Sequence, residues 1–383
     1  MRMDEVTDQK NRTGFFLYGV EEAGSMRQPT GIDRKVAAQL KALNEAGLSC
    51  RQLVYKQGRA GRWWRRLLPR LPFGCLYPRW RYREELDRAD FVYIRRDGMS
   101  LDRLRIIRKI RRRNPTAKIL YEVPTWPFRK ELTSRWWNYP LWWKEAVYMP
   151  YLHRYVDRIV IVGRAATIYG IPVIPMVNGI DLDAIRPIVP ATEDGAIHIA
   201  AVAMFTQWHG YDRFLRGMAA YYASGGKRCI VLHLIGRGPG ASELEQLVGR
   251  YGLSGRVILH GFLTGAELDA IYDRCHLGLI SLATQDKDIH IHSTLKSREY
   301  LAKGLPTIAT GMTDVFEGTD YRYNLCLSSD AVAVDMDEIA AFYDAVYGGR
   351  SREQVIAEIR AFAVRTVDIG ITMAPVVRYL KEG

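Results

Sequence analysis

Apolar and polar positions alternate in blocks along the chain, most regularly after residue 195. Short apolar runs, typical of buried parallel strands, lie at residues 197–203, 230–236, 256–260, 277–282 and 306–310. Stretches with helical periodicity lie between these runs, at residues 210–223, 241–251, 264–275 and 293–303. Strands and helices in this alternating order predict a parallel, doubly wound α/β sheet.

The first half of the chain shows the same alternation. Apolar runs predict strands at residues 14–19, 90–94, 118–122 and 157–162. A helix capped by Thr30 is expected to run to about Ala46, and a basic helix to cover residues 101–113. Because 383 residues exceed what one hydrophobic core usually holds, we expect two domains with a boundary near residues 175–190.

The stretch at residues 277–310 has the pattern of a strand, a polar loop, a helix and a second strand. Ser293 is expected to cap the helix, with Thr294 next to it, and Lys296 and Glu299 fall in its first two turns. In open α/β sheets, ligands bind at the carboxyl ends of the strands. The helix N-terminus and Lys296 favour a phosphate, whereas Glu299 suits a pair of hydroxyls such as a ribose diol. The sequence therefore predicts a nucleotide-sugar site here.

The net charge is +13, and the basic excess is concentrated in the first half of the chain. Residues 51–80 contain eight lysines and arginines and no acidic residue. Trp63 and Trp64 lie on an apolar face opposite several of these arginines, which predicts a segment that binds an anionic membrane surface. A surface flap that packs its tryptophans on its own domain is the alternative interpretation. Nucleic-acid binding is not expected, since no recognised nucleic-acid-binding module is present.

Several classes of protein are disfavoured by what the sequence lacks. The polar N-terminus is unlike a signal peptide, and no apolar run approaches the length of a membrane span. The five cysteines are scattered and include no C-x-x-C pair, so we expect reduced thiols and no metal site built from them. These features predict a cytoplasmic protein.

Glu122 is the candidate catalytic carboxylate. It ends a predicted strand, and Pro124 and Pro127 stiffen the loop that follows. A carboxylate at the carboxyl end of a strand is well placed to accept the proton of an acceptor hydroxyl. The alternative is a carboxylate hydrogen-bonded to the loop backbone. Trp126 in the same loop, and Trp136 further on, are candidates for contact with an acceptor or a membrane.

Several of these segments together resemble GT-B glycosyltransferases, close to glycosyltransferase family 4 and to enzymes of bacterial surface-polysaccharide synthesis. The matching segments are Glu299–Pro306 ("EAxAxGxP" in the family), Ile235–Pro239 ("GxGP"), His260–Phe262 (the base-recognition turn), Tyr121–Pro127 ("E-x-PTYP") and Asn178–Asp181 ("NGVD"). Two positions differ from the family pattern. Ile291 occupies the first acidic position of the E-x7-E pair, and the loop at 204–210 has no arginine or lysine, with His209 near the usual lysine.

The resemblance implies a GT-B fold, with two facing Rossmann-like domains and a cleft between them. It implies an acceptor-binding domain at residues 1–178, a donor-binding domain at 179–365 and a final helix at 366–383 that crosses back to the first domain. His209 joins Glu122 as a catalytic candidate. The implied donor-binding residues are Gly31, Thr206, Gly236, Arg237, Gly238, Phe262, Ser293, Thr294, Lys296 and Glu299.

The function implied is transfer of a hexosyl group from a nucleotide-diphosphate sugar to a saccharide acceptor, expected to be lipid-linked. The enzyme would be peripheral on the inner face of the plasma membrane, and would use no cofactor and no metal. If the reaction inverts the anomeric configuration, it needs a protein base such as Glu122. The alternatives are an inactive GT-B scaffold at the membrane that partners a true transferase, and a GT-B nucleotide-sugar epimerase.

Overall fold

The computed structural model describes residues 12–20, 31–56, 67–71, 74, 76, 80–133, 136–206, 209–283, 291–328 and 332–382. The chain divides into two compact units. Unit 1 comprises residues up to Val177 together with residues from Thr372 onward, and unit 2 comprises Asn178–Ile371.

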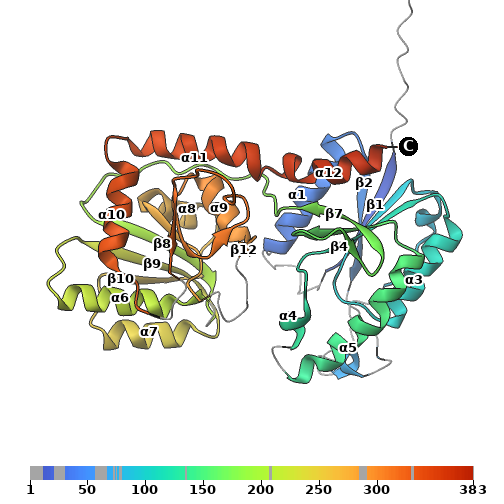
Figure 1. Ribbon diagram of the computed structural model, residues 1–383, viewed down its shortest axis with the longest axis horizontal. Coiled ribbons are helices and arrows are strands. Elements are labelled where there is room, and N and C mark those ends of the chain that lie inside the picture. The colour runs from blue at the N-terminus through green and yellow to red at the C-terminus, as the bar shows by residue number, and fades with distance from the viewer. Residues whose placement is uncertain are drawn as a thin grey trace, which may run out of the picture. The chain divides into compact units, whose positions relative to one another are not determined.

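Unit 1 is built on a seven-stranded sheet in the order β2-β1-β3-β4-β5-β7-β6 (Figure 1). Its strands are β1 (Thr13–Val20), β2 (Ser49–Lys56), β3 (Phe91–Arg95), β4 (Lys118–Val123), β5 (Arg158–Val162), β6 (Thr167–Ile168) and β7 (Ile171–Met176). Its helices are α1 (Gly31–Glu45), α3 (Leu101–Arg113), α4 (Arg129–Thr133) and α5 (Tyr139–Tyr148). Short 3-10 turns are η1 (Leu68–Arg70), η2 (Glu84–Arg88), η3 (Trp136–Asn138) and η4 (Met149–Arg154).

Unit 2 is built on a six-stranded sheet in the order β10-β9-β8-β11-β13-β15, and every pair in it is parallel. Its strands are β8 (Ile197–Met204), β9 (Ile230–Arg237), β10 (Val257–Gly261), β11 (Leu277–Leu279), β13 (Thr307–Thr310) and β15 (Asn324–Leu327). β12 (Ile291–His292) and β14 (Met312–Thr313) form a separate parallel pair. The helices that begin in this unit are α6 (Tyr211–Ala223), α7 (Ala241–Arg250), α8 (Gly265–Arg274), α9 (Leu295–Lys303), α10 (Met336–Tyr347), α11 (Arg352–Thr366) and α12 (Ile369–Lys381).

Alternate residues of each strand of unit 2 face opposite layers of helices, as the period of a strand requires. On β8, Ile197 and Ile199 pack into the core under α6 and α7, whereas Ala200 packs into a second core under α8 and α9. Figure 1 shows these two pairs of helices on opposite faces of the sheet. The predicted doubly wound α/β architecture is therefore confirmed for this unit.

The last helix, α12, begins in unit 2 and continues into unit 1. Within unit 1, Met373, Val376 and Leu380 are fully buried. The Nζ atom of Lys118 donates to the carbonyl of Tyr379 at 2.7 Å. The core of unit 1 is therefore completed by the C-terminal end of the chain.

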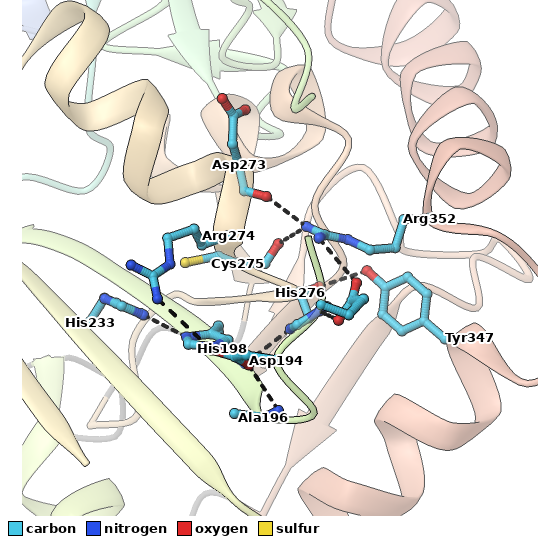
Figure 2. A network of polar contacts seen from close by, with 11 residues as sticks. Asp194, Ala196, His198, His233, Asp273, Arg274, Cys275, His276, Tyr347 and Arg352 are labelled. Carbon is cyan, nitrogen blue, oxygen red and sulfur yellow. Dashed lines mark hydrogen bonds and ion pairs between the residues drawn. The ribbon is translucent and has the colours of Figure 1, made fainter. Parts of the chain in front are cut away.

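A row of histidines crosses the sheet of unit 2 on three neighbouring strands. Figure 2 shows two of them, His198 and His233. Nδ1 of His198 on β8 lies 2.9 Å from Nε2 of His233 on β9, and Nδ1 of His233 lies 2.9 Å from Nε2 of His260 on β10. Nε2 of His198 lies 3.0 Å from the Asp194 carboxylate. Because a carboxylate accepts, Nε2–H of His198 donates to it, and the neutral rings then donate one to the next in a single direction.

His276 extends this network toward α10 and α11. Its Nδ1 accepts the backbone N–H of His198 at 3.0 Å, and its Nε2 lies 2.9 Å from a carboxylate oxygen of Glu193. Arg352 contacts the same carboxylate at 3.2 Å and donates to the carbonyl of Cys275 at 2.8 Å. The network thus fastens the segment before β8 to the helices that follow the sheet.

Two histidines of this network have strongly lowered pKa values, which predicts a loss of stability in acid. Burial, aided by His198, lowers the pKa of His233 to about 3, and burial, aided by Arg352, lowers that of His276 to about 4. In the unfolded chain both rings titrate near about 6.5, so the unfolded state binds more protons below that pH. We expect the free energy of unfolding to fall as the pH drops from about 6.5 toward 4, by up to ~1.4 kcal/mol per pH unit for each ring.

Urea unfolding of the wild-type protein and of His233→Gln, at neutral and mildly acidic pH, measures this slope. The variant loses stability at neutral pH because it breaks the row, but its remaining stability should fall less steeply in acid. His153→Gln is the matched control, since His153 is exposed in unit 1. If the free energy of unfolding fell equally steeply with pH in the wild type and in His233→Gln, the lowered pKa of His233 would be contradicted.

Candidate functional site

The predicted donor-binding residues of unit 2 gather at one edge of its sheet. Strands β8, β9, β10 and β11 run parallel, so the loops that follow them leave from the same edge. These loops carry Thr206, His209, Gly238 and Phe262, and the N-terminus of α9 carries Lys296. The structure thus brings together, in one unit, residues that the sequence scatters over about ninety positions.

The N-terminus of α9 is capped locally. The Thr294 side chain accepts the backbone N–H of Ser297 at 3.2 Å, and Gly304 ends the helix in the left-handed conformation with φ 78°. Ser293, predicted alongside Thr294, accepts instead from Arg298 and from the backbone of Asn178. The predicted cap at Ser293 is therefore wrong by one residue: Thr294 caps the helix, and Ser293 holds the loop ahead of it.

Lys296 lies in the first turn of α9 and points toward the sheet. Its Nζ is 3.0 Å from the carbonyl oxygen of Ile280 and 3.4 Å from the hydroxyl of Tyr211. The side chain as a whole is half-buried, but burial of its amine lowers the pKa to about 7. Among the described residues no carboxylate forms an ion pair with it, so an anion bound at this helix N-terminus would favour the charged form of the amine.

His209 lies in the loop between β8 and α6, stacked on Tyr211. The ring centroids are 5.4 Å apart and the rings are inclined by 25°. Nδ1 of His209 accepts the backbone N–H of Thr206 at 3.3 Å and lies 2.9 Å from the Thr206 hydroxyl. Because Nδ1 accepts, the neutral ring carries its proton on Nε2. His209, Tyr211 and Lys296 thus form one cluster at the carboxyl end of β8.

The glycine-rich turn after β9 is required by close packing. A Cβ atom on Gly236, which has φ 139°, would lie 1.8 Å from the carbonyl oxygen of Ala203. A Cβ atom on Gly238 would lie 2.4 Å from the carbonyl oxygen of Phe205. Arg237, between them, is exposed and places its guanidinium 4.5 Å from the ring centroid of Phe262. The glycines let β9 approach β8, and the Arg237–Phe262 pair is the part of this turn that faces solvent.

Glu299 lies one turn after Lys296 on α9 and is half-buried. One carboxylate oxygen accepts the hydroxyl of Tyr272 at 3.1 Å. Tyr272 is fully buried, so this contact orients the carboxylate from beneath. The two oxygens of a carboxylate accept several hydrogen bonds, so Glu299 stays the candidate for a diol.

Arg298 is a functional candidate that the sequence reasoning missed. It is fully buried and donates to the carbonyl of Asn178 at 2.8 Å and to Asp314 at 2.5 Å. Asn178 in turn donates from Nδ2 to the carbonyl of Ser293 at 2.5 Å. Arg298 therefore ties the first residue of unit 2 to the loop that leads into α9. The sequence signal that could have identified Arg298 is its charge at a position on the buried face of the short helix α9.

Glu122 does not fit the role of catalytic base. It is fully buried at the end of β4, forms a short ion pair with Arg95 and lies 3.5 Å from Nζ of Lys35. Gln39 and Tyr93 also donate to it, at 3.1 and 3.0 Å. Burial raises its pKa, but Arg95, Lys35 and the two hydrogen bonds outweigh burial and hold the pKa below its usual range. A buried carboxylate with four donors is a poor proton acceptor, and its partners are side chains, not the loop backbone.

The remaining predicted residues belong to unit 1. Trp126 is half-buried, with ring contacts to Phe128 at 5.4 Å and Tyr169 at 5.8 Å. Gly31 is the first residue of α1 and is exposed. Trp63 and Trp64 lie outside the described residues. Trp136 lies in η3, but its side chain lies outside what the structure describes.

Two findings concern metals and membranes. Within the described part of the chain, no group of three or more His, Cys, Asp or Glu side chains is arranged to hold a metal ion. Within the same ranges, none of the helices has the length and hydrophobicity required to span a bilayer.

The chain is similar to known proteins in sequence over part of unit 2 and in structure over nearly its whole length. Residues 196–347 match the family model for Glycosyl transferases group 1. A glycosyltransferase from Rickettsia africae ESF-5 has a similar structure, with a TM-score of 0.62 and 12% identity, over 97% of this chain and 98% of that one. Anabaena Alr3699/HepE in complex with UDP gives a TM-score of 0.59 and 12% identity, over 96% and 99%.

The lipopolysaccharide outer core galactosyltransferase WaaB, in its apo form, gives a TM-score of 0.56 and 12% identity, over 97% of this chain and 100% of that one. No curated protein sequence matches the chain. The similarity to the solved structures confirms the predicted fold class. The chain therefore has the GT-B fold, and residues 196–347 of its second unit match the family model for Glycosyl transferases group 1.

Proposed function

We propose that this protein transfers a hexosyl group from a nucleotide-diphosphate sugar to a saccharide acceptor. The observation that carries the proposal is Lys296, whose amine lies in the first turn of α9 without a carboxylate partner among the described residues. The N-terminus of α9 adds the backbone N–H groups of its first turn and the positive end of the helix dipole at the same place. A diphosphate bound there would raise the pKa of Lys296 and would be neutralised by the protonated amine and the helix dipole together.

The surrounding residues supply the other contacts of such a donor. Glu299 is placed to accept hydrogen bonds from a ribose diol, and the exposed face of Phe262 is placed to contact a base. Nε2–H of His209 is a donor for a phosphate or sugar oxygen. Because backbone N–H groups, Lys296 and Arg237 can neutralise the leaving diphosphate, the proposed transfer needs no metal ion.

The nucleotide is proposed to be UDP. Residues 196–347 match a glycosyltransferase family model, and HepE, which shares this fold, was crystallised with UDP. The acceptor is proposed to be a lipid-linked saccharide at the inner face of the plasma membrane, in the synthesis of a cell-surface polysaccharide. The basic, tryptophan-rich first half supports this, as does the fold shared with a lipopolysaccharide galactosyltransferase.

Thermal unfolding in the presence of UDP, GDP, dTDP or CMP, and of their common sugars, tests the proposal. A ligand at a hundred times its dissociation constant stabilises the folded state by about 2.7 kcal/mol. We expect a clear rise in Tm with UDP and UDP-sugars and smaller rises with the other nucleotides. No rise with any nucleotide would contradict the proposal and favour the inactive scaffold.

A further inference from the structure

Unit 1 exposes a group of large apolar side chains on a set of short elements that precede β5. Their exposed fractions lie between 42 and 52%, and the group comprises Leu67, Leu71, Trp137, Tyr139, Trp143 and Tyr151. We name this group the aromatic patch. Its members lie in or beside η1, η3, α5 and η4, at the end of unit 1 that carries α4 and α5 in Figure 1.

Helix α5 exposes aromatic residues and buries charged ones, which is the reverse of an ordinary surface helix. It exposes Tyr139 and Trp143, which are four residues apart and so share a face, and it buries Lys144 and Glu145. A helix that faces water normally does the reverse. Burial of two charged residues is unfavourable unless they are paired, so the orientation must be held by specific contacts.

Those contacts are present and fix the aromatic patch in place. Nζ of Lys144 donates to the carbonyls of Pro69 and Gly74, each at 2.6 Å. Glu145 accepts the backbone N–H of Met99 at 2.9 Å. Arg70, in η1, donates to the carbonyl of Trp137 at 3.1 Å. These hydrogen bonds therefore hold the elements that carry the exposed rings in fixed positions.

Basic side chains lie beside aromatic rings in this part of unit 1. The guanidinium of Arg154 lies 5.6 Å from the ring centroid of Tyr151, and that of Arg129 lies 5.4 Å from Trp142. Glu145 is buried and paired with Arg96 at 3.0 Å, whereas the short helix α4 contains Glu131. The sequence of residues 57–83 contains eight arginines and no acidic residue, and three of these arginines, Arg70, Arg81 and Arg83, lie among the described residues.

We propose that the aromatic patch docks the protein on an anionic bilayer surface. Tryptophan and tyrosine favour the boundary between headgroups and acyl chains, because each ring joins an apolar body to a polar atom. Basic residues beside them gain about 1 kcal/mol each near anionic lipid. This inference rests on the proposed function, because a lipid-linked acceptor would lie in that surface. Binding to the bilayer itself requires no catalysis.

A vesicle flotation experiment tests the docking surface. Purified full-length protein is mixed with vesicles of phosphatidylglycerol and phosphatidylethanolamine, or with vesicles of phosphatidylcholine alone. We expect binding to the first and at least tenfold weaker binding to the second. The double variant Trp137→Ser/Trp143→Ser should lose at least tenfold in affinity for the anionic vesicles. The matched control is Val364→Ser/Ile371→Ser, whose side chains are each 53% exposed outside unit 1.

Each other outcome counts against the proposal. Failure of the wild-type protein to float with anionic vesicles overturns it, as does equal binding by the Trp137/Trp143 double variant. If that variant instead abolishes self-association seen by light scattering and leaves vesicle binding intact, the aromatic patch is a protein interface. The thermal shift with UDP is measured on the same samples: its loss alone would contradict the proposed function, and docking would stand.

Discussion

Replacement of Glu122 by alanine is expected to lower the free energy of unfolding by about 3–5 kcal/mol. The change removes a carboxylate that pairs with both Lys35 and Arg95, and both cations are at least nine-tenths buried. Loss of this negative charge between two buried cations costs far more than the packing lost with one side chain. Urea unfolding of the wild type and of Glu122→Ala at neutral pH measures the difference.

Two further variants separate this structural role from a catalytic one. Glu122→Gln keeps the shape and the acceptor oxygen but loses the charge, so it should be destabilised by an intermediate amount. Glu338→Ala, an exposed change on α10, should stay within about 0.5 kcal/mol of the wild type. A Glu122→Ala protein that unfolds like the wild type, yet no longer transfers sugar, would restore the catalytic role.

Replacement of Lys296 by methionine is expected to weaken UDP-sugar binding by about ten- to a hundredfold, the usual worth of a hydrogen bond to a charged group. The side chain keeps its length and apolar stem, so its packing against Tyr211 and α9 is largely retained. The folded state should not be destabilised, because a buried amine that resists protonation is removed. Calorimetric titration with UDP-glucose measures the affinity, and Lys227→Met, an exposed change, is the matched control.

The same lysine gives donor binding a pH dependence of defined sign. Burial holds its pKa at about 7 in the free protein, and a bound diphosphate would raise it. Binding then takes up a proton, so affinity is greatest below pH 7 and falls as the pH rises above 7. Calorimetry at about pH 8, in buffers of different ionisation enthalpy, should detect this uptake for the wild type and not for Lys296→Met. Binding without proton uptake would place the diphosphate elsewhere.

The sequence predicts the elements of unit 2 well because their signal is local. Apolar runs and helical stretches after residue 195 correspond to β8, β9, β10, β11 and β13 and to the helices between them. The edge strand β2 was missed, since the apolar residues of Ser49–Lys56 are interrupted by charged and polar ones and form no continuous run. An edge strand is supported by one neighbour, and its own pattern is correspondingly weak.

The roles of single residues were harder to predict because they depend on contacts between distant segments. Glu122 looked catalytic at the end of its strand, but its partners come from α1 and β3, up to about ninety residues away. The histidine row arises from the register of three strands, and that register is absent from the spacing of His198, His233 and His260. The start of α9 was predicted to within one residue, because a helix N-terminus is a local feature.

The course of α12 has a consequence for the order in which the two units fold during translation. Unit 1 needs Met373, Val376 and Leu380 to close its core, whereas unit 2 is complete once Ile371 has emerged. The half that is translated second is therefore the half that can finish folding first. Until the last turn of α12 leaves the exit tunnel, unit 1 keeps an apolar seam open, which makes it the part of the nascent chain that most needs a chaperone.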